Sequence, residues 1–198
     1  MKKFLQKQFI SLSEFDFFLA EKRAEGIRIF LLWVIPSLIL FYLIEKYFPH
    51  SVRLHKAIQE GIGPNLWNVI GAFGLFSFGL SIIFPHSKWI LKSAKNILEN
   101  TFAIGCLSIG LLIGQWFFAL NHNDLEWWKV GFWGVTSGAL IFVVIVFNFC
   151  IWYLATLVNT EKLDFMNRIS KINFIWRLLI GISICFIIYA MFITTSNT

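Results

Sequence analysis

The strongest constraint in this sequence is a set of apolar runs, each long enough to cross a lipid bilayer. A spanning helix needs about 20 apolar residues, because each residue advances the helix by about 1.5 Å across a hydrocarbon core about 30 Å thick. Five segments meet this requirement, at residues 27–48, 66–84, 97–120, 130–158 and 174–193. The sequence therefore predicts an all-α fold, a polytopic membrane helix bundle with about five transmembrane helices.

Composition favours lipid over water as the solvent of this chain. Of the 198 residues, 58% are hydrophobic and 14% are charged, whereas about 25% are charged in a typical soluble domain. A soluble fold of this size would leave too much of its apolar surface in water. The net charge of +6 is explained by basic loops beside membrane spans, so we expect membrane lipids as partners and no direct binding of nucleic acid.

Basic residues in the connecting segments predict the orientation of the spans. They are concentrated in the N-terminal segment, after the second run and after the fourth run, and the intervening segments carry few. Because basic loops stay on the cytoplasmic side of a membrane, this alternation predicts a cytoplasmic N-terminus. Residues 1–26 are then a cytoplasmic amphipathic segment, and residues 27–198 are the transmembrane domain of a multi-pass protein in the bacterial inner (cytoplasmic) membrane.

Two runs carry glycines at helical spacing. The third run has Gly110 and Gly114, and the fourth has Gly131, Gly134 and Gly138. Glycines four residues apart lie on one helix face and let two helices approach closely in lipid. Two interpretations stay open: the third and fourth spans pack against each other within one chain, or one of these faces is a subunit contact in a homo-oligomer.

The spans carry almost no ionisable or strongly polar side chains. Their apolar centres lack Asp, Glu, Lys, Arg and His, and the polar candidates are Gln115 and Asn148, which we expect to form hydrogen bonds between helices. A coupled transporter normally needs an ionisable group or an interrupted helix at mid-depth. Enzyme and nucleotide-binding motifs are also missing from the sequence. We therefore expect no enzymatic activity, no metal site and no cofactor.

Short amphipathic helices are expected on the cytoplasmic face. Ile90, Ala94 and Leu98 share one face after the second run, and Phe165 and Ile169 share another after the fourth. Such helices either lie on anionic headgroups or bind a cytoplasmic partner or a neighbouring subunit. The basic residues expected to contact the lipid or the partner are Lys88, Lys92, Lys95, Arg168 and Lys171.

In size, hydropathy profile and basic cytoplasmic loops, the chain resembles the small multi-span membrane subunit of bacterial Kiwa-type phage-defence systems. That family is described with four spans, one fewer than the sequence predicts here. The resemblance implies an oligomeric inner-membrane component that senses membrane disturbance and recruits a cytoplasmic effector protein in antiviral defence. The first functional hypothesis is accordingly a non-enzymatic membrane scaffold or sensor. A passive channel or small-solute transporter, and an immunity protein against a pore-forming toxin, remain alternatives.

Overall fold

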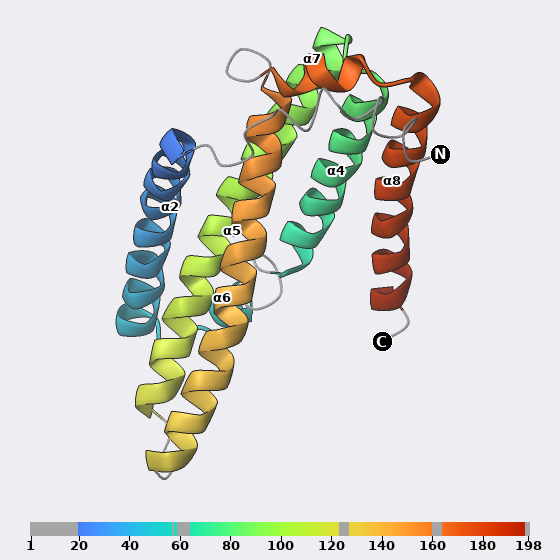
Figure 1. Cartoon of the computed structure of the whole chain (residues 1–198). Helices are drawn as coiled ribbons and strands as arrows, with labels where there is room; N and C mark the ends of the chain where they lie inside the picture. Colours follow the sequence, from blue (N-terminus) through green and yellow to red (C-terminus); the bar gives the residue numbers. More distant parts are fainter. Residues whose placement is uncertain (1–19, 57, 59–63, 123–126, 160–163, 197–198) are drawn as a thin grey trace. The chain divides into compact units, whose positions relative to one another are not determined.

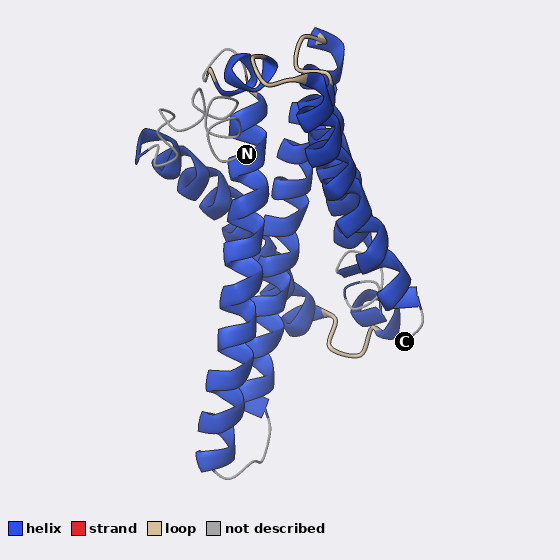
Figure 2. Cartoon of the chain, turned by 45° about the vertical axis from the view of Figure 1, so that its right-hand side comes forward, coloured by secondary structure: helices blue, strands red, loops and turns tan. Residues whose placement is uncertain are grey.

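The computed structural model describes residues 20–56, 58, 64–122, 127–159 and 164–196. Every regular element among these residues is a helix, and none is a strand (Figure 2). The helices in chain order are α2 (Ala20–Tyr47), α3 (Val52–Lys56), α4 (Pro64–Ile83), α5 (Lys88–His122), α6 (Trp127–Val158), α7 (Phe165–Ser170) and α8 (Phe174–Ser196) (Figure 1). The all-α prediction is confirmed for this part of the chain.

Three helices are long and apolar enough to cross a membrane. They contain the segments Ala24–Tyr47, Lys88–Leu120 and Trp128–Val158. In α4 and α8 the apolar stretches within the described residues are shorter, Gly71–Ile83 and Phe174–Phe186. In the part of the chain that the structure describes, three helices thus meet the length and hydropathy of a membrane span, which suggests a membrane protein.

Two helices begin earlier than the apolar runs suggest. The predicted boundary between residues 26 and 27 falls inside α2, and α5 begins at Lys88 rather than near residue 97. Ser87 starts α5 by accepting hydrogen bonds from the backbone N–H of Ile90 at its hydroxyl (3.5 Å) and of Leu91 at its carbonyl (3.0 Å). The predicted amphipathic helix after the second run is therefore the first part of a 35-residue helix. Of the predicted N-terminal amphipathic segment, residues 1–26, residues 1–19 lie outside the described residues.

The described residues form two compact units. Unit 2 comprises residues 21–69 and 102–150, which hold α2, α3, the second part of α5 and most of α6. Unit 1 comprises residues 70–101 and 151–198, which hold most of α4, the start of α5, the end of α6, α7 and α8. Helices α5 and α6 run continuously through both units.

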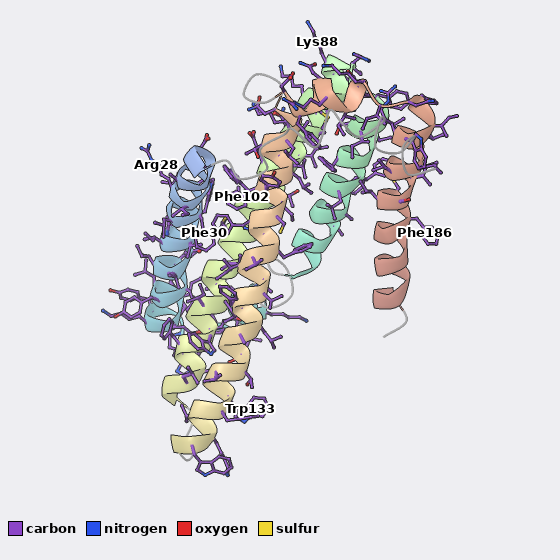
Figure 3. The ribbon with its side chains drawn as sticks, viewed as in Figure 1. Arg28, Phe30, Lys88, Phe102, Trp133 and Phe186 are labelled. Carbon is purple, nitrogen blue, oxygen red and sulfur yellow. The ribbon has the colours of Figure 1, made fainter. Side chains whose placement is uncertain are left out.

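Aromatic side chains form much of the core of unit 2. The Phe149 ring of α6 lies 5.3 Å from the ring of Phe30 on α2 and 5.7 Å from that of Phe102 on α5, centroid to centroid (Figure 3). Further along α2, Phe41 packs with Leu111 of α5. These contacts join the three long helices of the unit, because each aromatic ring buries a large apolar area.

In unit 1, the core lies where the start of α5, the end of α6 and α7 come together. Its most deeply buried apolar side chains, all at most 3% exposed, are Ala94, Leu98, Ile151, Ala155, Val158, Met166, Ile169 and Ile172. They recur at three- and four-residue intervals, as expected for helices that each bury one face.

Candidate functional site

The glycines of α5 form a close packing seam with α2. A methyl group on Gly110 would overlap the Ser37 hydroxyl and would lie 2.8 Å from the Val34 carbonyl oxygen. One turn later, a methyl group on Gly114 would lie 2.6 Å from the Phe41 ring. The Ser37 hydroxyl donates to the Val34 carbonyl at 2.8 Å, which satisfies it within its own helix. This seam, defined by these five residues, therefore needs glycine at both α5 positions.

The glycines of α6 contact α5 less closely. A methyl group on Gly134 would lie 3.7 Å from Leu120, and one on Gly138 would lie 3.4 Å from the Trp116 ring. The Trp116 indole also donates to the Ser137 hydroxyl at 2.8 Å. The two glycine patterns therefore do not face each other, because the α5 pattern faces α2 and the α6 pattern faces larger side chains of α5.

Gly131 differs from the other glycines of α6. It is exposed, and a methyl group added to it would meet nothing within 4 Å. Within the described residues, no close helix contact therefore requires a glycine at this position.

The two polar residues predicted within the spans lie in different surroundings. Asn148 is fully buried, and its amide nitrogen donates from α6 to the Phe102 carbonyl at 3.3 Å and to the Cys106 sulfur at 3.2 Å, both on α5. Gln115 is half-buried on α5, directly after Gly114. A buried amide that donates across two helices fixes their register. A shift in register would break the hydrogen bond, and no water is present inside a bilayer to replace it.

A second glycine seam, between α4 and α8, was missed by sequence reasoning. A methyl group on Gly181 would lie 2.5 Å from Ile83 and 2.9 Å from the Gly79 carbonyl oxygen. The Arg177 guanidinium donates to the Ile83 carbonyl at 3.5 Å, at the C-terminal end of α4. Gly181 is the single glycine of its apolar run, so no GxxxG pattern marks it.

The five predicted basic residues all belong to unit 1, on the first turns of α5 and on α7 with its C-terminal cap. We call this set the basic face: Lys88, Lys92, Lys95, Arg168 and Lys171. Lys88, Lys92 and Lys171 are exposed, and Figure 3 shows Lys88 pointing away from the helices. Lys95 and Arg168 are half-buried and lie 3.9 Å from Glu99 and Asp164 on their own segments.

The apolar residues between these basic side chains are buried. Ala94 and Leu98 of α5 have no exposed surface, and neither does Met166 of α7, while Ile169 is 3% exposed. These side chains pack inside the protein, so the amphipathic segments do not present their apolar faces to headgroups or to a partner. The surface that remains carries the exposed lysines together with the exposed Trp89.

An open groove lies between α2 and α5 in unit 2. It has a volume of about 520 Å³. We call it the aromatic groove, and its lining residues are Leu38, Phe41, Tyr42, Glu45 and Lys46 of α2 and Gly114, Phe117 and Phe118 of α5.

A histidine–carboxylate pair joins α2 to α3 at the charged end of the aromatic groove. The Glu45 carboxylate lies 2.9 Å from Nε2 of His55, and Nδ1 of His55 lies 2.9 Å from the Ser51 carbonyl oxygen. Both ring nitrogens face acceptors, and only the imidazolium can donate from both. The hydrogen bond to Ser51 and the Glu45 carboxylate raise the pKa of His55 above its ordinary value, against a smaller opposing effect of desolvation.

Together these features describe a class of protein: its described part is all-helical, with three helices long and apolar enough to cross a membrane, glycine seams between helices, a basic face in unit 1 and an aromatic groove in unit 2. Within the described ranges, no group of three or more His, Cys, Asp or Glu side chains is placed to hold a metal ion. No protein-family model, curated protein or solved structure matches the chain.

Proposed function

We propose that this protein is a non-enzymatic scaffold or sensor subunit of the bacterial inner membrane, and that its basic face docks a cytoplasmic partner. The observation that carries the proposal is the burial of the apolar side chains beneath the basic face. A helix resting on lipid would leave those side chains outside the protein. A fixed set of charges on a packed support is instead suited to recognising an acidic surface by electrostatic complementarity.

Five membrane crossings are part of this proposal. Helices α4 and α8 contain 20 and 23 residues, so each is at least about 30 Å long and matches the hydrocarbon core. Helix α5 contains 35 residues, which corresponds to about 52 Å. It is therefore longer than a bilayer core, and its first turns extend into the cytoplasm with Lys88 and Lys92.

Self-association is the second part of the proposal. The close glycine seam of α5 is occupied within the chain, so it is not free to bind a second copy. On α6, Gly131 lies beside the exposed side chains of Phe132 and Val135, 62% and 74% exposed. We place the contact between copies on this face of α6. A scaffold of this kind agrees with the role implied by the Kiwa-type resemblance, recruitment of an effector after membrane disturbance.

The docking surface is tested by site-specific photo-crosslinking in cells. A photoreactive residue at position 92, 95 or 171 should form a crosslinked species of one defined mass, and the same residue at position 53 should not. The triple variant Lys88→Glu, Lys92→Glu, Lys171→Glu should abolish the crosslink from position 95. The matched triple arginine variant should retain it, because it keeps the charge.

Other outcomes would favour the alternative functions. If charge reversal leaves the crosslink unchanged, the basic face is not the docking surface. If no position crosslinks and the purified protein conducts ions in planar bilayers, the protein is a channel rather than a scaffold. A crosslink to a pore-forming toxin from positions within the spans would favour the immunity role.

A further inference from the structure

The aromatic groove has the dimensions and lining of a ligand site. Its volume of about 520 Å³ falls within the range of about 300–1,000 Å³ that is typical of small-molecule sites. Its walls are apolar from Leu38 to Tyr42 on α2 and at Phe117 and Phe118 on α5, and its charged residues lie together at the end of α2. The groove therefore has an apolar part and a charged end, which match the hydrocarbon tail and the polar head of an amphiphile.

The groove runs along α2 from the interior of the helix to its end. From Leu38 to Lys46 the helix rises by about 12 Å, and α2 ends at Tyr47. Tyr42 and Tyr47 are 61% and 63% exposed, and exposed tyrosines of a spanning helix settle at the headgroup level. The charged end of the groove is thus at headgroup depth, and its apolar end reaches toward the hydrocarbon.

The charges at that end favour an anion. The imidazolium of His55 neutralises Glu45, because both ring nitrogens face acceptors. Lys46 forms no ion pair with another described residue, and its ammonium lies 5.8 Å from the centre of the Tyr42 ring and 5.5 Å from that of Tyr47. The end of the groove therefore carries one excess positive charge.

We propose that the aromatic groove binds one anionic glycerophospholipid, with an acyl chain along the apolar walls and the headgroup phosphate at Lys46. Where α2 and α5 cross the membrane, an acyl chain enters this open groove from the surrounding lipid without desolvation. A lysine ammonium binds a phosphate as a point charge. The site requires that α2 and α5 cross the membrane, and it does not depend on the docking of a cytoplasmic partner.

Native mass spectrometry of the full chain in mild detergent tests the site, with dioleoyl phosphatidylglycerol and dioleoyl phosphatidylcholine as probes. We expect one tightly retained phosphatidylglycerol. Lys46→Glu should weaken its binding by about tenfold or more, which corresponds to about 1.4 kcal/mol. The matched variant Lys129→Glu should leave it unchanged, because Lys129 also lies over an aromatic ring, that of Trp128, but outside the groove.

A second pair of variants tests the apolar part of the groove. Leu38→Trp should fill it and abolish retention of the lipid. Leu40→Trp, on the same helix but outside the lining, should leave retention unchanged. Circular dichroism and elution volume show whether each variant is folded, and Lys46→Glu changes an exposed side chain whose loss does not disturb the core.

Several results would overturn the lipid site. One is equal binding of both lipids together with no effect of Lys46→Glu. Another is an equal loss of phosphatidylglycerol binding in Lys46→Glu and Lys129→Glu. A third is retention of phosphatidylglycerol that Leu38→Trp leaves unchanged. Stabilisation by inorganic phosphate alone would show that an anion rather than a lipid is recognised. A dimer lost only in Leu38→Trp would assign the groove to a second copy. None of these results bears on the crosslinks from the basic face, so the two proposals fail separately.

Discussion

Among the described glycines, Gly110 has the least room for a side chain. Gly110→Ala should lower the free energy of unfolding by about 1–3 kcal/mol, because overpacking forces neighbouring backbone or side chains to shift. The added methyl group would overlap Ser37 and crowd the Val34 carbonyl. Gly134→Ala is the matched control, because its methyl group would lie 3.7 Å from Leu120, an ordinary contact, and it should leave stability unchanged or slightly higher. Reversible unfolding in mixed micelles measures both, and equal losses would contradict the seam between α2 and α5.

The His55–Glu45 pair predicts a pH dependence of stability. The charged group that faces the imidazole is the Glu45 carboxylate of α2, and the short helix α3 that carries His55 also carries Arg53 and Lys56. Because the pKa of His55 is raised in the folded protein, the stabilisation is complete below about pH 6.5, the pKa expected in the unfolded chain. It is lost as the pH rises through the raised value. The size of the loss is about 1 kcal/mol or less, as for other partly exposed pairs.

Glu45→Gln is the test of this pair. The glutamine can still accept the hydrogen bond but carries no charge, so the pKa of His55 should fall, as measured by NMR titration of its ring. The fall in melting temperature between about pH 6 and pH 9 should be smaller in the variant than in the original protein. An unchanged histidine pKa in Glu45→Gln would contradict the pairing.

Within the helices, the amphipathic start of α5 can be tested for packing on protein against lying on lipid headgroups. Leu98 has no exposed surface, whereas Trp89, two and a half turns earlier, is 78% exposed. Leu98→Ala should therefore lower the free energy of unfolding by about 2–5 kcal/mol, and Trp89→Ala should change it little. A segment lying on headgroups would give the opposite order, because Trp anchors at the interface. Thermal unfolding of the two variants in detergent measures the difference.

Much of the helical structure could be predicted from the sequence. Each of the five apolar runs is helical in the described residues, because long apolar runs in lipid must satisfy their backbone groups internally. The helix starts at Ala20 and Lys88 could not be predicted from hydropathy, which falls where charged residues enter a helix. The burial of Leu98 was equally hidden, since a face that rests on lipid and a face that packs on protein have the same periodicity.

The helices that contact the glycine faces also could not be predicted from the sequence. A GxxxG pattern predicts that some helix approaches closely, but it does not identify that helix. Gly110 and Gly114 face α2, where Ser37 supplies the small residue, and Gly181 faces Gly79 without any local pattern. The aromatic groove depends on residues from α2 and α5 that are about 70 positions apart, so only the structure shows it.

In the whole molecule, both proposed binding surfaces depend on the side of the membrane that each connecting segment faces. The basic face docks a cytoplasmic partner only if Lys92 and Lys171 are cytoplasmic. The charged end of the aromatic groove lies at headgroup depth only if α2 crosses. The rest of helix α5 and all of helix α6 lie between Lys92 and Lys171 in the chain, and both helices are long enough to cross. If both cross, Lys92 and Lys171 lie on one side, and the crossing of α4 decides whether Lys46 lies on the other.

Single-cysteine labelling in intact spheroplasts tests this arrangement most directly. In a background with the three native cysteines replaced by alanine, a membrane-impermeant maleimide should label Lys46→Cys and Lys129→Cys. It should label Lys92→Cys and Lys171→Cys only after the membrane is disrupted. Labelling of Lys46→Cys and Lys92→Cys from the same side would show that α4 does not cross, and it would contradict the five-crossing arrangement on which the cytoplasmic basic face depends.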